Sequence, residues 1–242
     1  MKKERLDKLL IDRKMFDSRT EAQGFILAGK ILVNDNPITK SGEKINIDSE
    51  IRIKGALKKY VSRGGEKLEI AVEKFEIDFS GKTVLDIGVS TGGFTDCALQ
   101  RGAISVTGID VGYGQLDLKI RNNPKVEIFE KTNARVLNLN KQFDFIICDV
   151  SFISTLKLLD TFNLHLKNDG KMIILIKPQF EAGKEFVEKG GIVKNIAIHK
   201  KILEDIKIKY AEKNFKLIGV AESRILFPKG NIEYLTYWER LI

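Results

Sequence analysis

A glycine-rich turn is the part of the sequence whose residue types and spacing point most directly to chemistry. Residues 86–94 are Asp-Ile-Gly-Val-Ser-Thr-Gly-Gly-Phe; they follow an apolar run at 83–85 and lead into a predicted helix at 94–100. Glycines let a ligand approach the backbone, and the free N–H groups at a helix start point toward it. This order of strand, turn and helix predicts a site for a nucleotide-like ligand.

The acidic residue ahead of the turn narrows the choice of ligand. The glycine spacing is not G-x-G-x-x-G, and Asp86 ends the predicted strand just before the first glycine. A carboxylate there would repel a pyrophosphate, whereas it suits a cationic ligand such as the amino and sulfonium groups of S-adenosylmethionine (SAM). Besides Asp86, the residues of this stretch that we expect to contact the cofactor are Gly88, Ser90, Thr91, Gly92, Gly93 and Phe94.

Two later polar residues fit the nucleoside part of such a ligand. Asp110 ends the second predicted strand, 22 residues after Gly88, where a carboxylate can accept both ribose hydroxyls. Asn133 follows the third strand and is placed to hydrogen-bond an adenine edge. The turn together with both carboxylates favours SAM over a nicotinamide cofactor.

Four charged residues stand where an active site would form. Lys67 lies in Ser-Arg-Gly-Gly-Glu-Lys-Leu at 62–68, Asp149 follows the fourth strand, Lys177 follows the fifth, and Glu233 begins the last. A single lysine or acid at a strand end is more often solvated or capping. Together they are candidates for catalysis, with Asp149 also near the cofactor.

The elements that must position these residues alternate between strand and helix. Strands are predicted at 83–87, 104–109, 126–129, 143–148, 172–176 and 217–221, and helices at 94–100, 116–120, 156–166 and 199–213. This alternation predicts an α/β, Rossmann-like fold whose parallel sheet is covered on both faces and binds ligands at the carboxyl ends of its strands. A last strand at 232–237 has no helix before it, so we expect it to be antiparallel.

The first quarter of the chain has a different pattern. Leu6, Leu9 and Leu10 have helical spacing, and Ser18 with Glu21 forms a capping box for a helix that ends at Gly29. Short strands are predicted at 31–33, 45–47 and 51–53, separated by turns at 34–37 and 41–42. We therefore expect a small α+β domain at 1–54, a linker at 55–61 and the larger domain at 62–242.

Charge is concentrated in this first quarter. The chain has 41 Lys and Arg against 33 Asp and Glu, a net charge of +8, and residues 1–60 hold 14 of the former and 9 of the latter. A basic module favours a polyanionic partner, most often nucleic acid, although a generally basic proteome is the plainer explanation. The candidate contacts to such a nucleic acid are Arg5, Arg13, Lys14, Arg19, Lys30, Lys58, Lys59 and Arg63.

The sequence also argues against several classes of protein. Its two cysteines fall inside predicted buried elements, so neither a disulfide scaffold nor a zinc site is expected, and no residue cluster suggests another metal. The start lacks an apolar signal core, and apolar runs are too short to span a bilayer. We expect a cytoplasmic protein.

Two family resemblances rest on specific motifs. Residues 3–54, with Ser-Arg-Thr at 18–20 and Ala-Gly-x-Ile-x-Val-Asn at 28–34, resemble the S4 RNA-binding domain, which presents basic side chains to structured RNA. The whole chain resembles the TlyA family of 2′-O-methyltransferases, whose catalytic domain is like that of FtsJ. The motifs are Val-Ser-Arg-Gly-Gly-x-Lys-Leu, Asp-Ile-Gly-x-Ser-Thr-Gly-Gly-Phe-Thr-Asp, Ile-Lys-Pro-Gln-Phe-Glu and Gly-Asn-x-Glu.

The TlyA resemblance implies SAM as cofactor and places the family's Lys-Asp-Lys-Glu tetrad on Lys67, Asp149, Lys177 and Glu233. Lys177 would remove the proton of a ribose hydroxyl, helped to stay neutral by Lys67. Asp149 would orient Lys177, and Glu233 would hold Lys67 or the ribose.

The resemblance further implies cytidine 2′-hydroxyls of ribosomal RNA as substrate. Some members act on both subunits and some on the large one alone; because this chain lacks the longer termini of the former, we expect large-subunit RNA. Two alternatives remain open: a membrane-active haemolysin, a name that the family carries, and a non-catalytic RNA-binding factor for ribosome assembly. The oligomeric state is left open.

Overall fold

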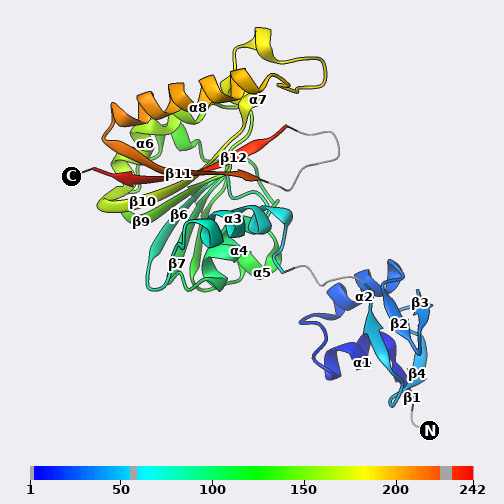
Figure 1. Cartoon of the computed structure of the whole chain (residues 1–242). Coiled ribbons are helices and arrows are strands. Elements are labelled where there is room, and N and C mark those ends of the chain that lie inside the picture. The colour runs from blue at the N-terminus through cyan, green and yellow to red at the C-terminus, as the bar shows by residue number, and fades with distance from the viewer. Residues whose placement is uncertain (1–2, 55–58, 224–230, 242) are drawn as a thin grey trace. The chain divides into compact units, whose positions relative to one another are not determined.

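The computed structural model describes residues 3–54, 59–223 and 231–241. The chain divides into two compact units, Met1–Lys58 and Lys59–Ile242, each described here by itself (Figure 1). Residues 55–58 of the expected linker, with Lys58 among the predicted RNA contacts, lie outside the described residues, and residues 59–61 belong to the second unit.

The first unit is a small α+β domain, as the sequence predicts. Its elements are β1 (Lys3–Arg5), α1 (Leu6–Asp12), α2 (Arg19–Leu27), β2 (Ile31–Val33), β3 (Asn36–Ile38), β4 (Lys44–Asn46) and β5 (Ile51–Ile53). Strands β3, β2 and β5 form one antiparallel sheet, and β1 pairs with β4. Both helices bury Leu6, Leu10 and Ile26 against Ile31 of the sheet.

The turn predicted at 34–37 is shorter than expected. Asn34 and Asp35 have φ of 49° and 66°, the left-handed conformation of a two-residue hairpin turn, while Asn36 and Pro37 already pair with β2. Proline is tolerated there because β3 is an edge strand, where a missing N–H need not break the ladder.

The Ser18 half of the predicted capping box of α2 is present, since Ser18 Oγ accepts a hydrogen bond from the Glu21 N–H at 3.2 Å. The helix is followed by Gly29 with φ of +65°, as the sequence predicts. Ser18→Ala should therefore lower the free energy of unfolding of the first unit by about 1 kcal/mol. Urea denaturation followed by circular dichroism measures this loss, with Thr20→Ala on the same helix as the control; equal midpoints for both variants would contradict the cap's role.

The second unit is built on a seven-stranded sheet with the order β11-β12-β10-β9-β6-β7-β8. Its strands are β6 (Thr83–Ile87), β7 (Ser105–Ile109), β8 (Val126–Phe129), β9 (Phe143–Cys148), β10 (Leu166–Ile176), β11 (Phe215–Ser223) and β12 (Glu233–Arg240). Strands β6 to β10 are parallel, and β12 lies between β10 and β11, antiparallel to both. The predicted mostly parallel sheet with an antiparallel last strand is confirmed.

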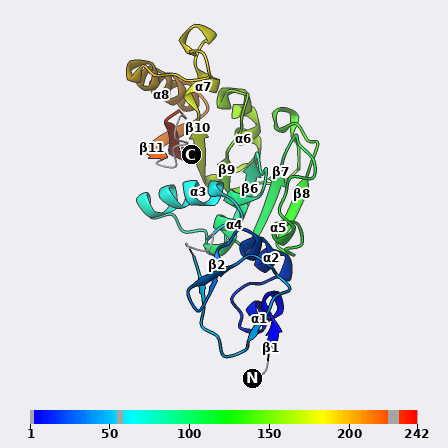
Figure 2. The same cartoon turned by 90° about the vertical axis from the view of Figure 1, so that its right-hand side faces the viewer.

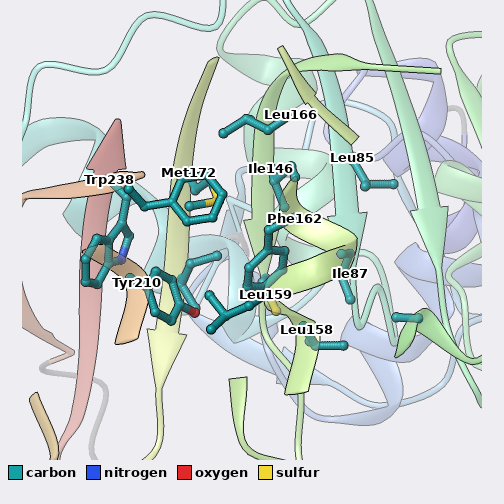
Figure 3. Packing of buried hydrophobic residues seen from close by; sticks show 14 of the residues in the cluster. Leu85, Ile87, Ile146, Leu158, Leu159, Phe162, Leu166, Met172, Tyr210 and Trp238 are labelled. Carbon is teal, nitrogen blue, oxygen red and sulfur yellow. The ribbon is translucent and has the colours of Figure 1, made fainter. Parts of the chain in front are cut away.

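Helices cover both faces of this sheet (Figures 1 and 2). The helices are α3 (Arg63–Lys74), α4 (Gly93–Gln100), α5 (Leu118–Arg121), α6 (Leu159–His165), α7 (Pro178–Glu181) and α8 (Ile196–Ala211), with short 3-10 turns at Ala134–Val136, Thr155–Leu158 and Lys184–Phe186. Alternate strand residues pack against α3 and α4 on one face and against α6 and α8 on the other. On the second face, the stacked rings of Tyr210 and Trp238 have centroids 4.3 Å apart (Figure 3).

Several elements of the second unit differ from the sequence expectation. Helix α3 was not predicted, because the two glycines in its first turn, Gly64 and Gly65, hide the helical spacing of Leu68, Ala71 and Val72. Strand β10 begins at Leu166 rather than at residue 172. Residues 167–171 are polar or glycine and do not alternate with apolar residues, because the register of β10 against β9 shifts between Leu166 and Lys171. The predicted helix at 156–166 is a 3-10 turn followed by α6.

Candidate active site

The glycine turn after β6 packs closely against the loop that follows β9. Gly88 has φ of +86°, and a Cβ added there would lie 2.5 Å from the carbonyl oxygen of Asp149. Gly92, the residue before α4, has φ of +92° and faces the side chains of Leu116 and Ile120. Glycine is required at 88 both by its positive φ and by the lack of space for a side chain, so the turn can pack directly against the Asp149 backbone.

Two adjoining cavities meet at this turn and share Gly88, Ser90 and Asp149. The first, about 420 Å³, is also lined by Ser62, Arg63, Gly64, Lys67, Val89, Thr91, Gly93 and Phe94. The second, about 330 Å³, reaches Asp110, Gln115, Asn133, Ser151 and Phe152. Both volumes are in the range of small-ligand sites. A larger hollow, about 680 Å³, beside α3 and β11 contains none of the predicted site residues.

The four charged candidates form two ion pairs. Lys67, in the second turn of α3, contacts Glu233 at the start of β12, with Nζ and Oε2 2.6 Å apart. Lys177, directly after β10, contacts Asp149 directly after β9, with Nζ and Oδ1 also 2.6 Å apart. Lys67 thus lies within a helix, where the sequence predicted only the end of an element.

The surroundings of these pairs limit their exposure to water. At most a fifth of any of the four side chains is exposed, and the Lys177 ammonium also donates to Ser151 Oγ at 2.8 Å. Lys67 and Asp149, one from each pair, line the same cavity. Paired ammonium and carboxylate groups beside a ligand cavity are suited to binding and deprotonating a hydroxyl group.

The predicted nucleoside contacts lie on the second cavity. Asp110 accepts the Ser90 and Gly112 N–H groups at 2.7 and 2.6 Å, which ties the end of β7 to the glycine turn. The side-chain oxygen of Asn133 accepts the Arg135 N–H at 3.0 Å. Each carboxylate oxygen has a further lone pair, and the Asn133 amide N–H₂ group is suited to a hydrogen-bond acceptor on a base.

Asp86 does not lie where the sequence interpretation expected it. Its side chain is fully buried, accepts the Thr95 hydroxyl at 2.6 Å and lines neither cavity. Burial raises its pKa to about 7, opposed by the Thr95 hydrogen bond and assisted by the nearby charge of Asp149. The expectation that Asp86 contacts a cationic ligand directly is therefore wrong for this structure. The carboxyl instead lies inside the protein, where it holds the Thr95 hydroxyl of α4.

Asp86→Asn should change how stability depends on pH. The folded protein keeps the Asp86 proton up to about pH 7, whereas the unfolded chain loses it near 3.8, the ordinary pKa of an aspartic acid, so wild-type stability falls as the pH rises between these values. An amide does not titrate, so the variant should gain stability relative to wild type from about pH 4 to pH 7, with a constant difference above that range. Urea unfolding across this range measures the difference, and parallel curves would contradict it.

The sequence analysis did not name several of the cavity residues as site residues, among them Gln115, Ser151 and Phe152. Gln115 and Ser151 line the second cavity, and Ser151 also contacts Lys177. Phe152 is 90% exposed with φ of +67°, a rare conformation for an aromatic residue, and its ring lies 5.1 Å from that of Phe180. No sequence motif identifies these three residues as ligand contacts. The only available signal was their position, with Ser151 and Phe152 shortly after Asp149 and Gln115 shortly before α5.

The predicted RNA contacts are engaged with other groups of the protein to different degrees. Arg5 and Arg19 both pair with Asp7, and Arg13 donates to the carbonyls of Ile47 and Ser49. The remaining predicted contacts are placed as follows: Lys14 is exposed, Lys30 lies over the Phe25 ring, Lys59 pairs with Glu69, and Arg63 lines the first cavity.

Both histidines have structural partners. His165 Nε2 accepts the Leu139 N–H, and its Nδ1 lies 2.9 Å from the Thr161 carbonyl. His199 contacts the Tyr234 hydroxyl and the Val193 carbonyl. Within the described ranges, no group of three or more His, Cys, Asp or Glu side chains is arranged to hold a metal ion.

Comparison with known families agrees with this architecture. The family of FtsJ-like methyltransferases matches residues 60–240, and the S4 domain family matches residues 4–51. Hemolysin A of Brachyspira hyodysenteriae is 42% identical over 97% of this chain and 99% of its own length. The 23S rRNA (cytidine-2′-O)-methyltransferase TlyA of Campylobacter jejuni is 35% identical over 96% of this chain and 89% of its own.

Further relatives cover both units. The 16S/23S rRNA (cytidine-2′-O)-methyltransferase TlyA of Mycobacterium tuberculosis is 35% identical over 96% of this chain and 88% of its own length. A solved structure named "Putative hemolysin" from Streptococcus thermophilus covers 99% of this chain and 89% of its own, with a TM-score of 0.74 and 38% identity. The chain belongs to the TlyA/hemolysin A family, which joins an S4 domain to an FtsJ-like methyltransferase domain.

Proposed function

We propose that this protein transfers the methyl group of SAM to the 2′-hydroxyl of a cytidine in ribosomal RNA, with large-subunit RNA as its main substrate. The observation that carries this proposal is the arrangement of Lys67 with Glu233 and Lys177 with Asp149 beside the glycine turn. Ribosomal RNA also implies a cytoplasmic location.

The residues around the turn fit SAM. The two joined cavities, both lined by Gly88, offer room for an elongated ligand, and the acceptors on Asp110 suit ribose hydroxyls. The proposed SAM contacts are Gly88, Ser90, Thr91, Gly92, Gly93, Phe94, Asp110, Asn133 and Asp149. SAM would supply an electrophilic methyl group, so the protein itself must orient and deprotonate the hydroxyl.

Lys177 is the proposed base. Its Nζ is held on two sides, by Asp149 and by Ser151, which directs the lone pair of the neutral amine to a single place. Lys67 adds a second positive charge beside the first cavity, and Glu233 keeps that lysine in place. Orientation of the hydroxyl by these groups should contribute much of the rate acceleration.

The relatives favour the large subunit. The TlyA proteins of Campylobacter jejuni and Mycobacterium tuberculosis both name 23S rRNA, and only the second also names 16S rRNA. The test is incubation of the protein with isolated small and large subunits and radiolabelled SAM, followed by mapping of the methylated nucleotide. Label at a cytidine 2′-oxygen of large-subunit RNA is expected; label in neither RNA would overturn the proposal.

A second candidate function, membrane lysis, is favoured by the names of two similar proteins, Hemolysin A and the solved structure named "Putative hemolysin". In the described parts of the chain, no helix is long and apolar enough to cross a membrane. Leakage from dye-loaded liposomes treated with the pure protein distinguishes the two functions, and we expect no leakage.

A third candidate is a non-catalytic factor for ribosome assembly. A catalytically inactive variant that fully restored a deletion phenotype would indicate this function.

A further inference from the structure

The first unit contains a fully buried carboxylate among its basic residues. Asp7, in the first turn of α1, accepts Arg5 Nε and one Arg5 terminal nitrogen at 3.1 and 3.0 Å, an Arg19 terminal nitrogen at 2.7 Å and Gln23 Nε2 at 2.8 Å. The hydrogen bonds from Arg5, followed by those from Arg19 and Gln23, hold the pKa of Asp7 well below its usual range against the effect of burial. A charge buried in this way is stable only because several donors converge on it.

The two arginines that meet on Asp7 remain available to solvent. Their side chains are 46% and 54% exposed, and the bonds to Asp7 use two of the five N–H donors of Arg5 and one of those of Arg19. A Cβ at Gly42 would lie 3.5 Å from Arg5 Cζ, so a longer side chain there would crowd the guanidinium. The cluster therefore presents two cationic groups, from β1 and α2, around one buried negative charge.

We propose that Asp7 is a positioning residue that joins Arg5 and Arg19 into a single phosphate-binding site for RNA. This inference rests on RNA as partner in the proposed function, but not on methyl transfer. Guanidinium groups bind phosphate through paired N–H donors. Two that are already held by a buried carboxylate lose less side-chain entropy when they bind. Because Asp7 itself is covered, a phosphate would meet the donors rather than the carboxylate.

Charge alone predicts the opposite effect of removing Asp7. Replacing a carboxylate by a neutral amide near a polyanion should strengthen binding. If Asp7 positions the arginines, Asp7→Asn should weaken binding, because an amide has one acceptor oxygen in place of two and its N–H₂ group repels guanidinium donors. The sign of the change therefore separates positioning from bulk electrostatics.

The experiment measures binding of the whole protein to a labelled RNA stem–loop by fluorescence anisotropy over a series of salt concentrations. We expect Asp7→Asn to weaken binding about tenfold at low salt and to reduce the slope of log K against log salt by about 1, the share of roughly one phosphate contact. The control is Asp12→Asn, an exposed residue of the same helix with the same change of charge, which should leave both the affinity and the slope at least as large as in wild type.

A second variant covers the case in which Asp7→Asn does not fold, as judged by circular dichroism. Arg19→Lys keeps the positive charge but loses the planar pair of donors, so it should weaken RNA binding at unchanged net charge. Unchanged or tighter binding by a folded Asp7→Asn protein, or full affinity of Arg19→Lys, would overturn the inference. Absence of methyl transfer in the subunit assay would leave this binding result intact, which separates the two failures.

Discussion

Lys177→Ala is expected to slow methyl transfer by about 10²–10⁴-fold while SAM still binds. General base catalysis contributes about 10²–10⁴-fold to a rate, and the loss of kcat should fall in this range. Lys177 lines neither cavity of the glycine turn, so removal of its side chain disturbs the proposed cofactor contacts only through its ion-pair partner Asp149, which lines both cavities. Single-turnover methylation of purified subunits measures the first quantity, and calorimetry with SAM measures the second.

Lys177→Arg distinguishes a base from a mere ion-pair partner. Arginine keeps the positive charge beside Asp149 but cannot act as a base, because its guanidinium stays protonated in proteins. This variant should be as inactive as the alanine variant, and Lys209→Ala, on the exposed end of α8, should be fully active. An active arginine variant, or joint loss of SAM binding and activity in Lys177→Ala, would be evidence against the role of base.

The part of the site that directly follows parallel strands could be predicted from the sequence, because parallel strands place their carboxyl ends at the same edge of a sheet. Asp149 and Lys177 follow the neighbouring strands β9 and β10, so their contact follows from strand order. The contact of Lys67 with Glu233 is one of two roles that the family resemblance implied for Glu233, the other being a contact with the ribose. The burial of Asp86 could not be predicted, because the sequence shows that a carboxylate ends a strand but not which way its side chain points.

The fold was predictable where local pattern and tertiary environment agree. Strands β6 and β9 are buried apolar runs and have the predicted bounds. Helix α3 was missed because Gly64 and Gly65 weaken its local signal. Tertiary packing requires the second of them, since a Cβ at Gly65 would overlap the ring of Tyr60. Likewise, the left-handed backbone conformation of Phe152 could not be predicted, because phenylalanine has no preference for it and the surrounding loop imposes it.

Gly88→Ala should weaken SAM binding and lower the activity with it. A residue with φ of +86° is strained when it carries a Cβ, by about 1–3 kcal/mol, and here the Cβ would also lie 2.5 Å from the Asp149 carbonyl oxygen. The loop that carries Asp149 and Ser151 must therefore move, and it bears both the lining of the two cavities and the partners of Lys177. The affinity for SAM should fall about tenfold or more, since 1.4 kcal/mol corresponds to a factor of ten.

Gly81→Ala is the matched control, because it separates backbone strain from the clash. Gly81 precedes the same strand, β6, and has a similar φ of +72°, but a Cβ there would meet no atom within 4 Å. Both variants should lower the midpoint of urea unfolding, and only Gly88→Ala should weaken the calorimetric binding of SAM. Equal loss of SAM affinity in the two variants would mean that strain in the unit as a whole, rather than the contact between the glycine turn and Asp149, controls the cofactor site.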